Sequence, residues 1–301
     1  MQRIHLPNNN PFCLIFRLYK SQFLDESVRR GLINPCHLSL AGDGTPLETA
    51  RLERSKRICG CPKGSGCGCK RKFSQPGCNW GWDSSRNKYF SGYHLYMFVA
   101  ADSENDLPIF PMLERASRHD MLSFLHTFFS MKSYLPEFHI EKLLLDAAHD
   151  AYPLYEYCKT NRITPFIDLN PGHTGHFKYK DNFTIDEDGV PVCKMGLRMH
   201  HDGVEKAKHR EKYRCPLADR KINIPPRDSK EWKLEYNRRT SVERSNKREK
   251  TDYKLEDGRH RSSKMWYCRL YAIMMLQHLD AWEMPTRVDT IFTFSRMATS
   301  K

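Results

Sequence analysis

The segment Ile140–Asp150, IEKLLLDAAHD, decides how the chain is expected to fold. Its apolar residues predict a buried strand over Ile140–Leu145, and Asp146 follows directly at the end of that strand. The helical spacing of apolar residues predicts one helix before the strand, over 119–134. A second, shorter helix over 152–159 precedes a further strand at 163–169. Strands that alternate with helices in this way are typical of a sheet covered by helices.

Three antiparallel strands are predicted upstream of this segment. The stretch His37–Ala41 alternates between two faces and runs into an expected turn at Asp43-Gly44-Thr45. Strand character returns at Tyr89–Ala101, and Leu107–Leu113 follows after a turn. The whole order predicts an α/β fold with a mixed sheet, three antiparallel strands and then parallel strands, flanked by helices.

Two polar stretches interrupt this pattern. Residues 51–87 are rich in Gly, Cys, Lys and Arg, and residues 172–230 are rich in Gly, Pro, His and Lys, so both are expected to be insertions. The predicted organisation is an N-terminal helical segment over 1–36, a main domain over 37–283 and a C-terminal tail over 284–301.

Three further helices are expected outside the sheet. Apolar residues at helical spacing predict one at 12–32, ended by Asn34-Pro35. A polar helix is expected at 231–250, and a helix at 263–282 is apolar on nearly every side and should be buried.

Composition describes a folded protein with a basic surplus. Of the 301 residues, 49 are Lys or Arg and 36 are Asp or Glu, a net charge of +13. From Arg198 to Lys264 there are 21 Lys or Arg against 12 Asp or Glu, so nine of these charges lie in one stretch. Such a stretch can bind polyphosphate by releasing counterions, or it can be a solvated basic face.

The cellular compartment is predicted from the membrane-spanning and secretory segments that the sequence does not show. The apolar stretch Leu95–Ala101 is much shorter than the roughly 20 residues of a membrane-spanning helix, and no secretory leader is visible. We therefore expect a cytoplasmic protein without a membrane span. Eleven cysteines in such a chain indicate reduced thiols or metal ligands rather than disulfides.

Three acidic residues are candidates for catalysis. Asp43 and Asp146 lie at the expected ends of strands, and Glu243 lies within the basic helix. Three such carboxylates can hold two divalent cations about 3.5–4 Å apart for phosphoryl chemistry. Each also has a simpler interpretation: Asp43-Gly44 as a turn, Asp146 as a helix cap, and Glu243 as the ion-pair partner of Arg239.

The helix at 231–250 adds a more specific pattern. Tyr236, Arg239, Glu243 and Lys250 stand at offsets 0, 3, 7 and 14, which fall within an arc of roughly 60° on a continuous helix. One face would then present a phenol, a guanidinium, a carboxylate and an ammonium, a set suited to the end of a DNA duplex. The alternative is a solvent-exposed face with ion pairs within the helix.

These residues resemble a known family. The spacing Tyr236-x2-Arg239-x3-Glu243-x6-Lys250 resembles the Tyr-Arg-Glu-Lys signature of DDE transposases of bacterial insertion sequences. Asp43-Gly44-Thr45 looks like the first aspartate motif of that family. The segment Leu144–Asp150 is similar to its second aspartate motif. The resemblance covers roughly residues 37–283.

The resemblance implies a ribonuclease-H-like catalytic domain. Asp43, Asp146 and Glu243 would then bind two Mg²⁺ ions, or Mn²⁺, with Asp150 as the competitor of Asp146. A water molecule would attack the phosphodiester at the transposon end, and the freed 3′-hydroxyl would attack again. Tyr236, Arg239 and Lys250 are expected to hold the terminal phosphates.

The same resemblance implies partners and surroundings. The DNA partner would be double-stranded, as both transposon ends and target. The protein would assemble as a homo-oligomer on paired ends and would be associated with the nucleoid in the bacterial cytoplasm. Residues 1–36 would be the remnant of an end-binding domain. Two other functions stay open: a transposase-derived DNA-binding protein without catalysis, and a general nuclease on the same fold.

Cysteine clusters are candidates for zinc. Cys59, Cys61, Cys67 and Cys69 could close a tetrahedral site, although the Cys-x-Cys gaps are tighter than usual and free cysteines in a loop are the alternative. A second set could form a small knuckle or none: Cys193, Cys215, His200, His201 and His209.

Overall fold

A computed structural model describes residues 11–49, 62, 75, 77–84, 86–169, 183–193, 196–205, 209–214, 225–227, 229–260 and 262–283. The chain divides into two compact units. The first unit comprises Met1–Leu144 and Arg238–Lys301, and the second comprises Leu145–Asn237.

A mixed sheet forms the centre of the first unit. Its strands are β1 (Leu38–Glu48), β2 (Asn79–Asp83), β3 (Lys88–Ala100), β4 (Pro108–Arg115) and β5 (Ile140–Leu145). The hydrogen-bonded order is β2-β3-β1-β5, and β4 also pairs with β3. β1 runs antiparallel to β3 and parallel to β5, and β3 runs antiparallel to β4. The predicted mixed sheet, with three antiparallel strands followed by a parallel one, is confirmed.

Strand β3 is long enough to pair along both of its edges. Residues 92–100 pair with β1 on one edge, while the other edge pairs with β2 and then with β4. Strand β2 lies within the stretch 51–87 that was expected to be a polar insertion. In β2 the tryptophans Trp80 and Trp82 are exposed, whereas Gly81 and Asp83 are buried, which reverses the usual pattern of apolar residues facing the core.

The turn expected at Asp43-Gly44-Thr45 is wrong. β1 continues to Glu48, and Asp43 pairs with Met97 in the middle of the strand. The physical reason is the length of β3, which supplies pairing partners for β1 as far as Gly92. An Asp-Gly pair favours a turn only where no neighbouring strand extends the ladder.

The helices of the first unit agree with the prediction, with one exception discussed below. The predicted helix at 12–32 becomes α1 (Pro11–Tyr19), a π-helical turn η1 (Lys20–Leu24) and α2 (Asp25–Arg29). The helix at 119–134 is α3 (Asp120–Tyr134), and the helix at 263–282 is α7 (Ser263–Glu283).

Helix α3 covers one face of the sheet through aromatic side chains. Phe98 of β3 lies edge-on to Phe124 and Phe128 of α3, with ring centroids 5.9 and 6.2 Å apart. All three rings are buried. Edge-to-face aromatic pairs add to the free energy of burying the rings.

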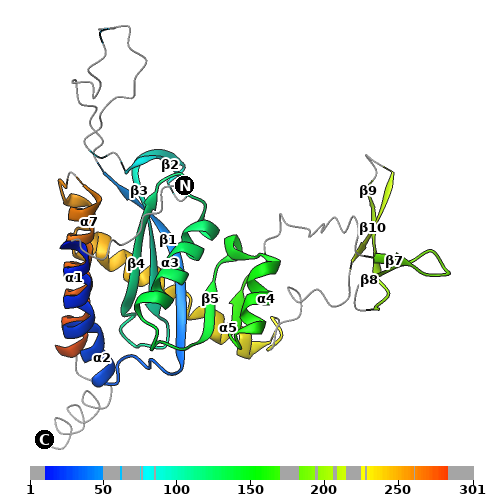
Figure 1. Cartoon of the computed structure of the whole chain (residues 1–301), viewed down its shortest axis with the longest axis horizontal. Helices are drawn as coiled ribbons and strands as arrows, with labels where there is room; N and C mark the ends of the chain where they lie inside the picture. The colour runs from blue at the N-terminus through cyan, green and yellow to red at the C-terminus, as the bar shows by residue number, and fades with distance from the viewer. Residues whose placement is uncertain are drawn as a thin grey trace, which may run out of the picture. The chain divides into compact units, whose positions relative to one another are not determined.

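Helix α7 lies beside α1 (Figure 1). Phe16 and Tyr19 of α1 contact Tyr271 of α7, with ring centroids 6.0 and 5.4 Å apart. The Tyr19 hydroxyl donates a hydrogen bond to the carbonyl of Pro108 in β4 at 2.6 Å. Nδ1 of His278 in α7 and Oγ of Ser27 in α2 form a hydrogen bond with a length of 2.7 Å. These contacts bind the N-terminal helices to α7 and to the sheet.

The continuous helix expected at 231–250 is wrong. The structure has α5 (Lys230–Asn237), then α6 (Thr240–Lys247) and a π-helical turn η4 (Arg248–Asp252). At the junction, Ser241 and Val242 donate to carbonyls only three residues back, those of Arg238 and Arg239. Polar and β-branched residues at 240–242 are poor helix formers, which favours the break here.

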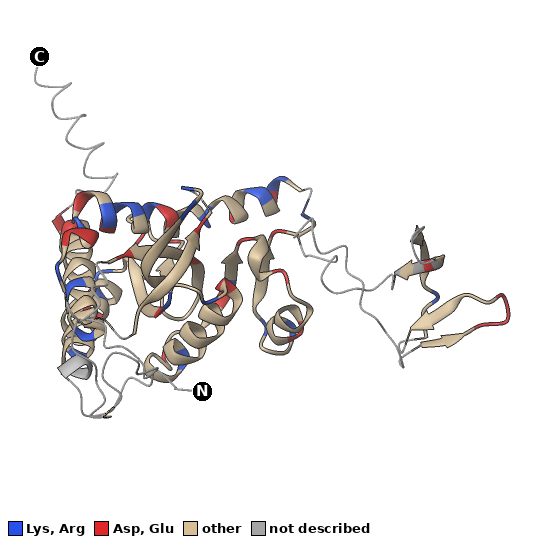
Figure 2. Cartoon of the chain, turned by 90° about the horizontal axis from the view of Figure 1, so that it is seen from above, with Lys and Arg blue, Asp and Glu red and all other residues tan. Residues whose placement is uncertain are grey.

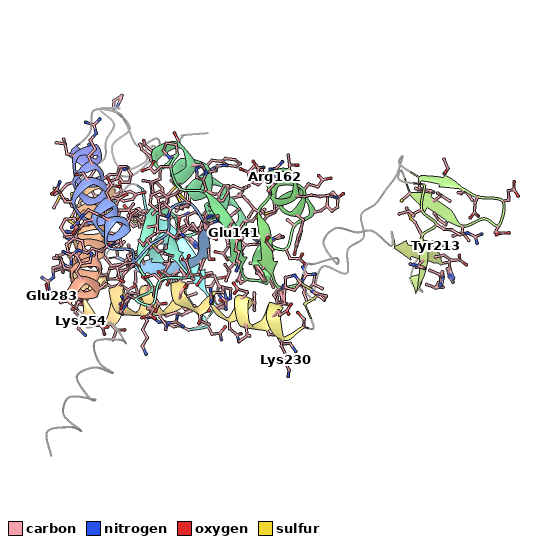
Figure 3. The ribbon with its side chains drawn as sticks, turned by 90° about the horizontal axis from the view of Figure 1, so that it is seen from below. Glu141, Arg162, Tyr213, Lys230, Lys254 and Glu283 are labelled. Atoms are coloured by element: carbon pink, nitrogen blue, oxygen red, sulfur yellow. The ribbon has the colours of Figure 1, made fainter. Side chains whose placement is uncertain are left out.

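The second unit contains α4 (Tyr152–Thr160), the short strand β6 (Thr164–Ile167) and α5, each where the sequence predicted a helix or strand. The polar stretch 172–230 contains two small hairpins of paired strands: β7 (Phe183–Ile185) with β8 (Pro191–Cys193), and β9 (His200–Glu205) with β10 (Arg210–Arg214). The second of these hairpins carries Tyr213 on its strand β10 (Figure 3). Figure 2 shows that the turn between β7 and β8 is acidic. None of the described helices combines the length with the apolar character that a membrane span requires.

The aromatic contact between β3 and α3 predicts a large loss of stability in Phe98→Ala. Removing a buried Phe ring typically costs about 3–5 kcal/mol of unfolding free energy. Leu122→Ala on the exposed side of α3 is the matched control, and surface changes usually stay within about 0.5 kcal/mol. Urea unfolding of the two variants measures both values, and equal losses would contradict this packing.

One carboxyl group is buried in the core beneath these helices. Glu249 of η4 is fully buried and accepts a hydrogen bond from Gln277 of α7 at 3.3 Å. Its Oε2 has no hydrogen-bond partner among the described residues. Burial raises the pKa of Glu249 to about 8, while Gln277 and the nearby Lys250 and Arg248 oppose the shift. The folded state therefore binds the proton of Glu249 more tightly than the unfolded state.

This burial predicts how stability changes with pH. Between the ordinary pKa of 4.5 and about 8, the folded state keeps a proton that the unfolded state has lost. The unfolding free energy should therefore fall as pH rises through this range and level off above it. Glu249→Gln keeps the acceptor for Gln277 and should remove this component, so its advantage over the parent should grow from pH 5 to pH 8. Urea unfolding across that range measures the difference; a pH-independent difference would contradict the burial of an ionisable group here.

Candidate functional site

Asp43 lies in the middle of β1 and is half-buried. Side chains alternate between the two faces of a strand, so Asp43 and Thr45 point to the same face. Thr45 accepts a hydrogen bond from Lys250 at 2.7 Å, and Lys250 belongs to η4, the continuation of α6. Asp43 therefore faces the side of the sheet on which α6 and η4 pack.

Gly44 is required by a close approach on the opposite face of β1. A Cβ atom at this position would lie 2.1 Å from Nε2 of His94 and 2.6 Å from Oδ1 of Asp120. His94 of β3 is largely buried and its Nε2 lies 2.9 Å from the Asp120 carboxylate at the start of α3. The Asp-Gly pair thus serves packing beside Asp43 rather than a turn.

Glu243 lies on α6 and forms an ion pair in this structure. Its Oε1 is 2.7 Å from Nη2 of Arg239, and its side chain is 48% exposed. This is the ion pair within the helix that the sequence offered as the simpler interpretation. It places a guanidinium beside the carboxylate, and both residues belong to the first unit.

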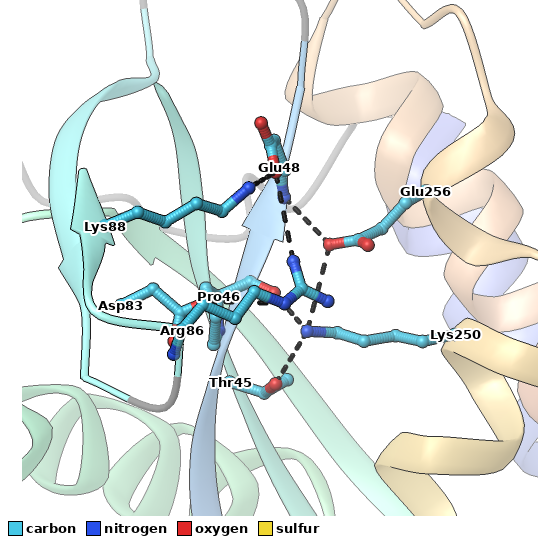
Figure 4. Close-up of polar contacts among 8 residues, drawn as sticks. All are labelled: Thr45, Pro46, Glu48, Asp83, Arg86, Lys88, Lys250 and Glu256. Carbon is cyan, nitrogen blue, oxygen red and sulfur yellow. Dashed lines mark hydrogen bonds and ion pairs between the residues drawn. The ribbon is translucent and has the colours of Figure 1, made fainter. Parts of the chain in front are cut away.

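The helical spacing predicted that Lys250 shares an exposed face with Arg239 and Glu243. In the structure it does not. Its ammonium group donates to Thr45 Oγ1 and to the carbonyl of Pro46, and it lies 3.8 Å from Glu256 (Figure 4). The side chain is only 16% exposed, and burial lowers the pKa of Lys250. The π-helical turn η4 widens the helix, so a spacing counted at 100° per residue does not hold here.

Asp146 lies where the sequence placed it, directly after β5. Its Oδ1 accepts from the backbone N–H of Ala148 at 3.1 Å and lies 2.5 Å from Nδ1 of His149. It therefore caps the short helix η3 (Ala147–His149), as the alternative interpretation proposed. The Asp146 side chain is 37% exposed, whereas His149 is buried. The buried ring and the backbone N–H fix how this carboxylate is oriented.

Asp150 is held in a different way. It is buried, and its Oδ1 accepts a hydrogen bond from the Tyr155 hydroxyl at 3.1 Å. Arg227 donates to the same hydroxyl at 3.0 Å and to the carbonyl of Ile167. Burial, with the Asp150 carboxylate as a further cause, raises the pKa of Tyr155. Asp150 thus belongs to a buried polar network, while Asp146 is more accessible.

Tyr236 lies on α5 in the second unit. Its ring stacks on Trp232 with centroids 4.6 Å apart, and Trp232 in turn contacts Phe166 of β6 at 6.3 Å. The aromatic ring of Tyr236 is therefore positioned by packing within its own unit.

The predicted carboxylates suit a magnesium site by their chemistry. Mg²⁺ prefers carboxylate oxygens, and Asp43, Asp146 and Glu243 supply them. Among the described residues, however, no three His, Cys, Asp or Glu side chains lie close enough together to hold a metal ion. Asp43 and Glu243 belong to the first unit and Asp146 to the second. The donor set fits Mg²⁺, while this structure contains no assembled metal site within the part of the chain that it describes.

Of the six cysteines considered as zinc ligands, one lies among the described residues. Cys59, Cys61, Cys67 and Cys69 lie outside the described residues, as does Cys215. Cys193 is buried and not in a disulfide.

Sequence reasoning missed two kinds of partner. His149 follows Asp146 by three residues, and the N-cap interpretation of Asp146 was the signal that could have found it. The second kind comprises the partners of Lys250. Thr45 and Pro46 are distant from it in sequence, and Glu256 lies beyond the predicted helix, so no local pattern indicated them.

Comparison with known proteins identifies the family of the chain. A family model described as Transposase DDE domain matches residues 37–277. The matched range contains all strands of the sheet and the three predicted carboxylates. A search of curated proteins found no match.

The close approach at Gly44 predicts that Gly44→Ala destabilises the protein. The added methyl group must displace His94 from Asp120, and such overpacking typically costs about 1–3 kcal/mol. His94→Ala removes the nearer of the two side chains and releases the Asp120 carboxylate from its ion pair, so Gly44→Ala should cost less in this background than in the parent. Urea unfolding of both single variants and the double variant measures this cycle; costs that simply add would contradict the clash.

Proposed function

Because the chain belongs to the transposase DDE domain family, a family of catalytic polynucleotidyl transferases that act in DNA transposition, we propose that it cuts the ends of a mobile element and joins them to target DNA. The proposal extends to the Tyr-Arg-Glu-Lys group of insertion-sequence transposases. The mixed sheet flanked by helices is consistent with the ribonuclease-H-like fold of this family.

The observation that carries the proposal is the packing of α6 and η4 on the face of β1 that bears Asp43. Within one unit, this packing sets the strand that carries the first aspartate against the helix that carries Glu243. Asp146 would complete the set from the end of β5. We propose that these three carboxylates bind divalent metal during the reaction.

Enzymes of this family typically use divalent metal ions, and we propose Mg²⁺, which Mn²⁺ can replace. Bound Mg²⁺ would lower the pKa of the attacking water and stabilise charge on the scissile phosphate. The chain itself would hold the carboxylates in place: Asp43 through the pairing of β1 with β3, and Asp146 through His149 and the Ala148 N–H. We prefer Asp146 to Asp150 because the Asp150 carboxylate is buried against Tyr155.

We further propose that Arg239 and Tyr236 contact DNA phosphates. The guanidinium of Arg239 can bind a phosphate through two parallel hydrogen bonds. In this structure Arg239 is paired with Glu243, so a phosphate that attracts Arg239 would leave the Glu243 carboxylate available for metal. Lys250 is left out of this set because its ammonium group is bonded to β1. The assembly on paired ends would be a homo-oligomer.

One observation favours an alternative, a DNA-binding protein without catalysis. Glu243 is paired with Arg239, Asp146 caps η3, and the described residues contain no cluster of three metal ligands. Divalent-metal dependence of strand cutting separates this alternative from the proposed function.

The proposed function predicts cutting that depends on each of the three carboxylates. Duplex DNA taken from the flanks of the reading frame should be cut by the parent protein in Mg²⁺ and not in EDTA. Asp43→Asn, Asp146→Asn and Glu243→Gln should each lower the rate at least about 100-fold, because each removes a charged ligand of the proposed metal ions, which would stabilise the reacting phosphate. Denaturing gels of end-labelled duplexes measure strand cutting.

Glu141→Gln is the matched control, since this exposed carboxylate on β5 pairs only with His37 among the contacts observed here and lies outside the proposed set. It should cut like the parent. A parent protein that binds the duplex without cutting it would favour the alternative function, and equal cutting of duplexes without terminal repeats would indicate a general nuclease.

A further inference from the structure

The connection between β3 and β4, residues 101–107, is bonded to the helix that carries Glu243. It follows directly from β3, the strand that pairs with β1 around Asp43. The buried Asp106 of this connection binds Arg244 of α6 through two hydrogen bonds, Nε to Oδ2 at 2.7 Å and Nη2 to Oδ1 at 2.6 Å. This ion pair therefore joins the helix of one proposed metal ligand to the sheet of another, within the first unit.

The guanidinium of Arg244 also holds the first turn of α6. Its Nη1 donates to the hydroxyl of Thr240, the first residue of the helix, at 2.6 Å. Glu243 directly precedes Arg244 and belongs to the same turn. The bonds to Asp106 and Thr240 thus fix the part of the helix from which the Glu243 side chain extends.

Arg248 adds a second link between the same two segments. Its Nη2 donates to the carbonyl of Asn105 and, at 3.1 Å, to the carbonyl of Asp106. Arg248 begins η4 and lies four residues after Arg244, so both arginines lie on one face of the helix. Two guanidinium groups one helical turn apart therefore bond to two adjacent residues of the connection.

The backbone of Asp106 has a conformation that suits this role. Its φ is +50°, in the left-handed region that Asn and Asp adopt more readily than other residues with a side chain. The N–H of Asp106 donates to the carbonyl of Ser103 at 3.2 Å. In this conformation both the carboxylate and the carbonyl of Asp106 bond to the helical segment 244–248.

A similar ion pair elsewhere in the first unit shows what is particular here. Arg29 binds Glu26 with the same two-bond geometry, at 2.6 Å for each bond, but both residues belong to α2. Such a pair within one exposed helical surface contributes little to stability. Asp106 and Arg244 are 138 residues apart in the sequence, so their pair sets the position of one element relative to another.

We propose that Asp106 is a positioning residue, which acts through Arg244 to hold Glu243 at a fixed place relative to Asp43. This inference rests on the proposed function for its catalytic consequence. Asp106 lies in the connection after β3, so it would act on the metal ions only through the first turn of α6. Without the ion pair, the Glu243 carboxylate would still be present but poorly placed, so assembly of the metal site would need more Mg²⁺.

Asp106→Asn tests the proposal in the full chain, with Glu26→Gln as the matched control. Asparagine tolerates the left-handed backbone but removes the charge and one of the two acceptors for Arg244. Hydrogen–deuterium exchange of peptides covering residues 239–247 reports the order of α6 without DNA or metal. Binding of a labelled duplex of flanking DNA in EDTA gives the affinity. Cutting of the same duplex at saturating DNA gives the Mg²⁺ concentration at which the rate is half-maximal.

Asp106→Asn should exchange faster in α6 and bind the duplex as the parent does. It should need about 10-fold more Mg²⁺ for half-maximal cutting, which is typical of losing a group that orients a metal ligand. Glu26→Gln should match the parent in all three measurements.

An unchanged Mg²⁺ requirement in Asp106→Asn would overturn the proposal, even if α6 exchanged faster, because the ion pair would then only stabilise the fold. Tighter DNA binding at the Mg²⁺ requirement of the parent would also overturn it. Asp106 would in that case compete with DNA for Arg244.

Arg244→Gln is the second variant and keeps the proposal falsifiable if Asp106→Asn does not fold. It should raise exchange in α6 and the Mg²⁺ requirement in the same direction. Because the two residues act through one link, the variant with both changes should need no more Mg²⁺ than the worse single variant. Effects that multiply would refute the link. If the parent binds DNA without cutting it, the proposed function fails, whereas exchange still decides whether Asp106 holds α6.

Discussion

The position of one strand, β1, is the constraint on which the candidate site depends. β3 pairs with β1 from Leu40 to Glu48. Asp43 therefore cannot shift along the sheet without breaking many backbone hydrogen bonds at once. On one face, Gly44 lets His94 approach within a distance that no larger residue would permit. On the other face, Lys250 joins β1 to the segment that follows α6. A residue held on an edge and on both faces has little freedom, which is what a metal-binding carboxylate needs.

Two of the candidate carboxylates, Glu243 and Asp146, have a basic or hydrogen-bonding partner in the protein without DNA. Glu243 has the guanidinium of Arg239 beside it, and Asp146 has the buried His149. Each partner stabilises the carboxylate while no cation is bound, and each partner competes with a metal for it. If Arg239 moved from Glu243 to a DNA phosphate, the Glu243 carboxylate would become available for metal when the substrate arrives. One guanidinium cannot form paired hydrogen bonds with both anions at once.

Much of the fold could be predicted from the sequence, because its signals are local. The apolar run before Asp146, the helical spacing in α3 and the apolar character of α7 on nearly every side predicted these elements correctly. The candidate site residues were proposed from their types and spacing, and they stay a prediction. What failed depends on distant partners: Asp43-Gly44 has the composition of a turn, yet the long strand β3 extends the ladder past it. The break before α6 and the π turn at Lys250 likewise changed which face Lys250 presents, and residue spacing alone cannot show this.

The central claim is that Asp43, Asp146 and Glu243 meet around divalent metal when DNA is bound. A crystal structure of the protein with flanking duplex DNA and Mn²⁺ tests it most directly, because Mn²⁺ is located by its anomalous scattering. The account predicts two metal ions about 3.5–4 Å apart, with oxygens of all three carboxylates among their ligands. Metal bound without Asp146 or Glu243, in a complex whose DNA end lies at β1, would contradict it.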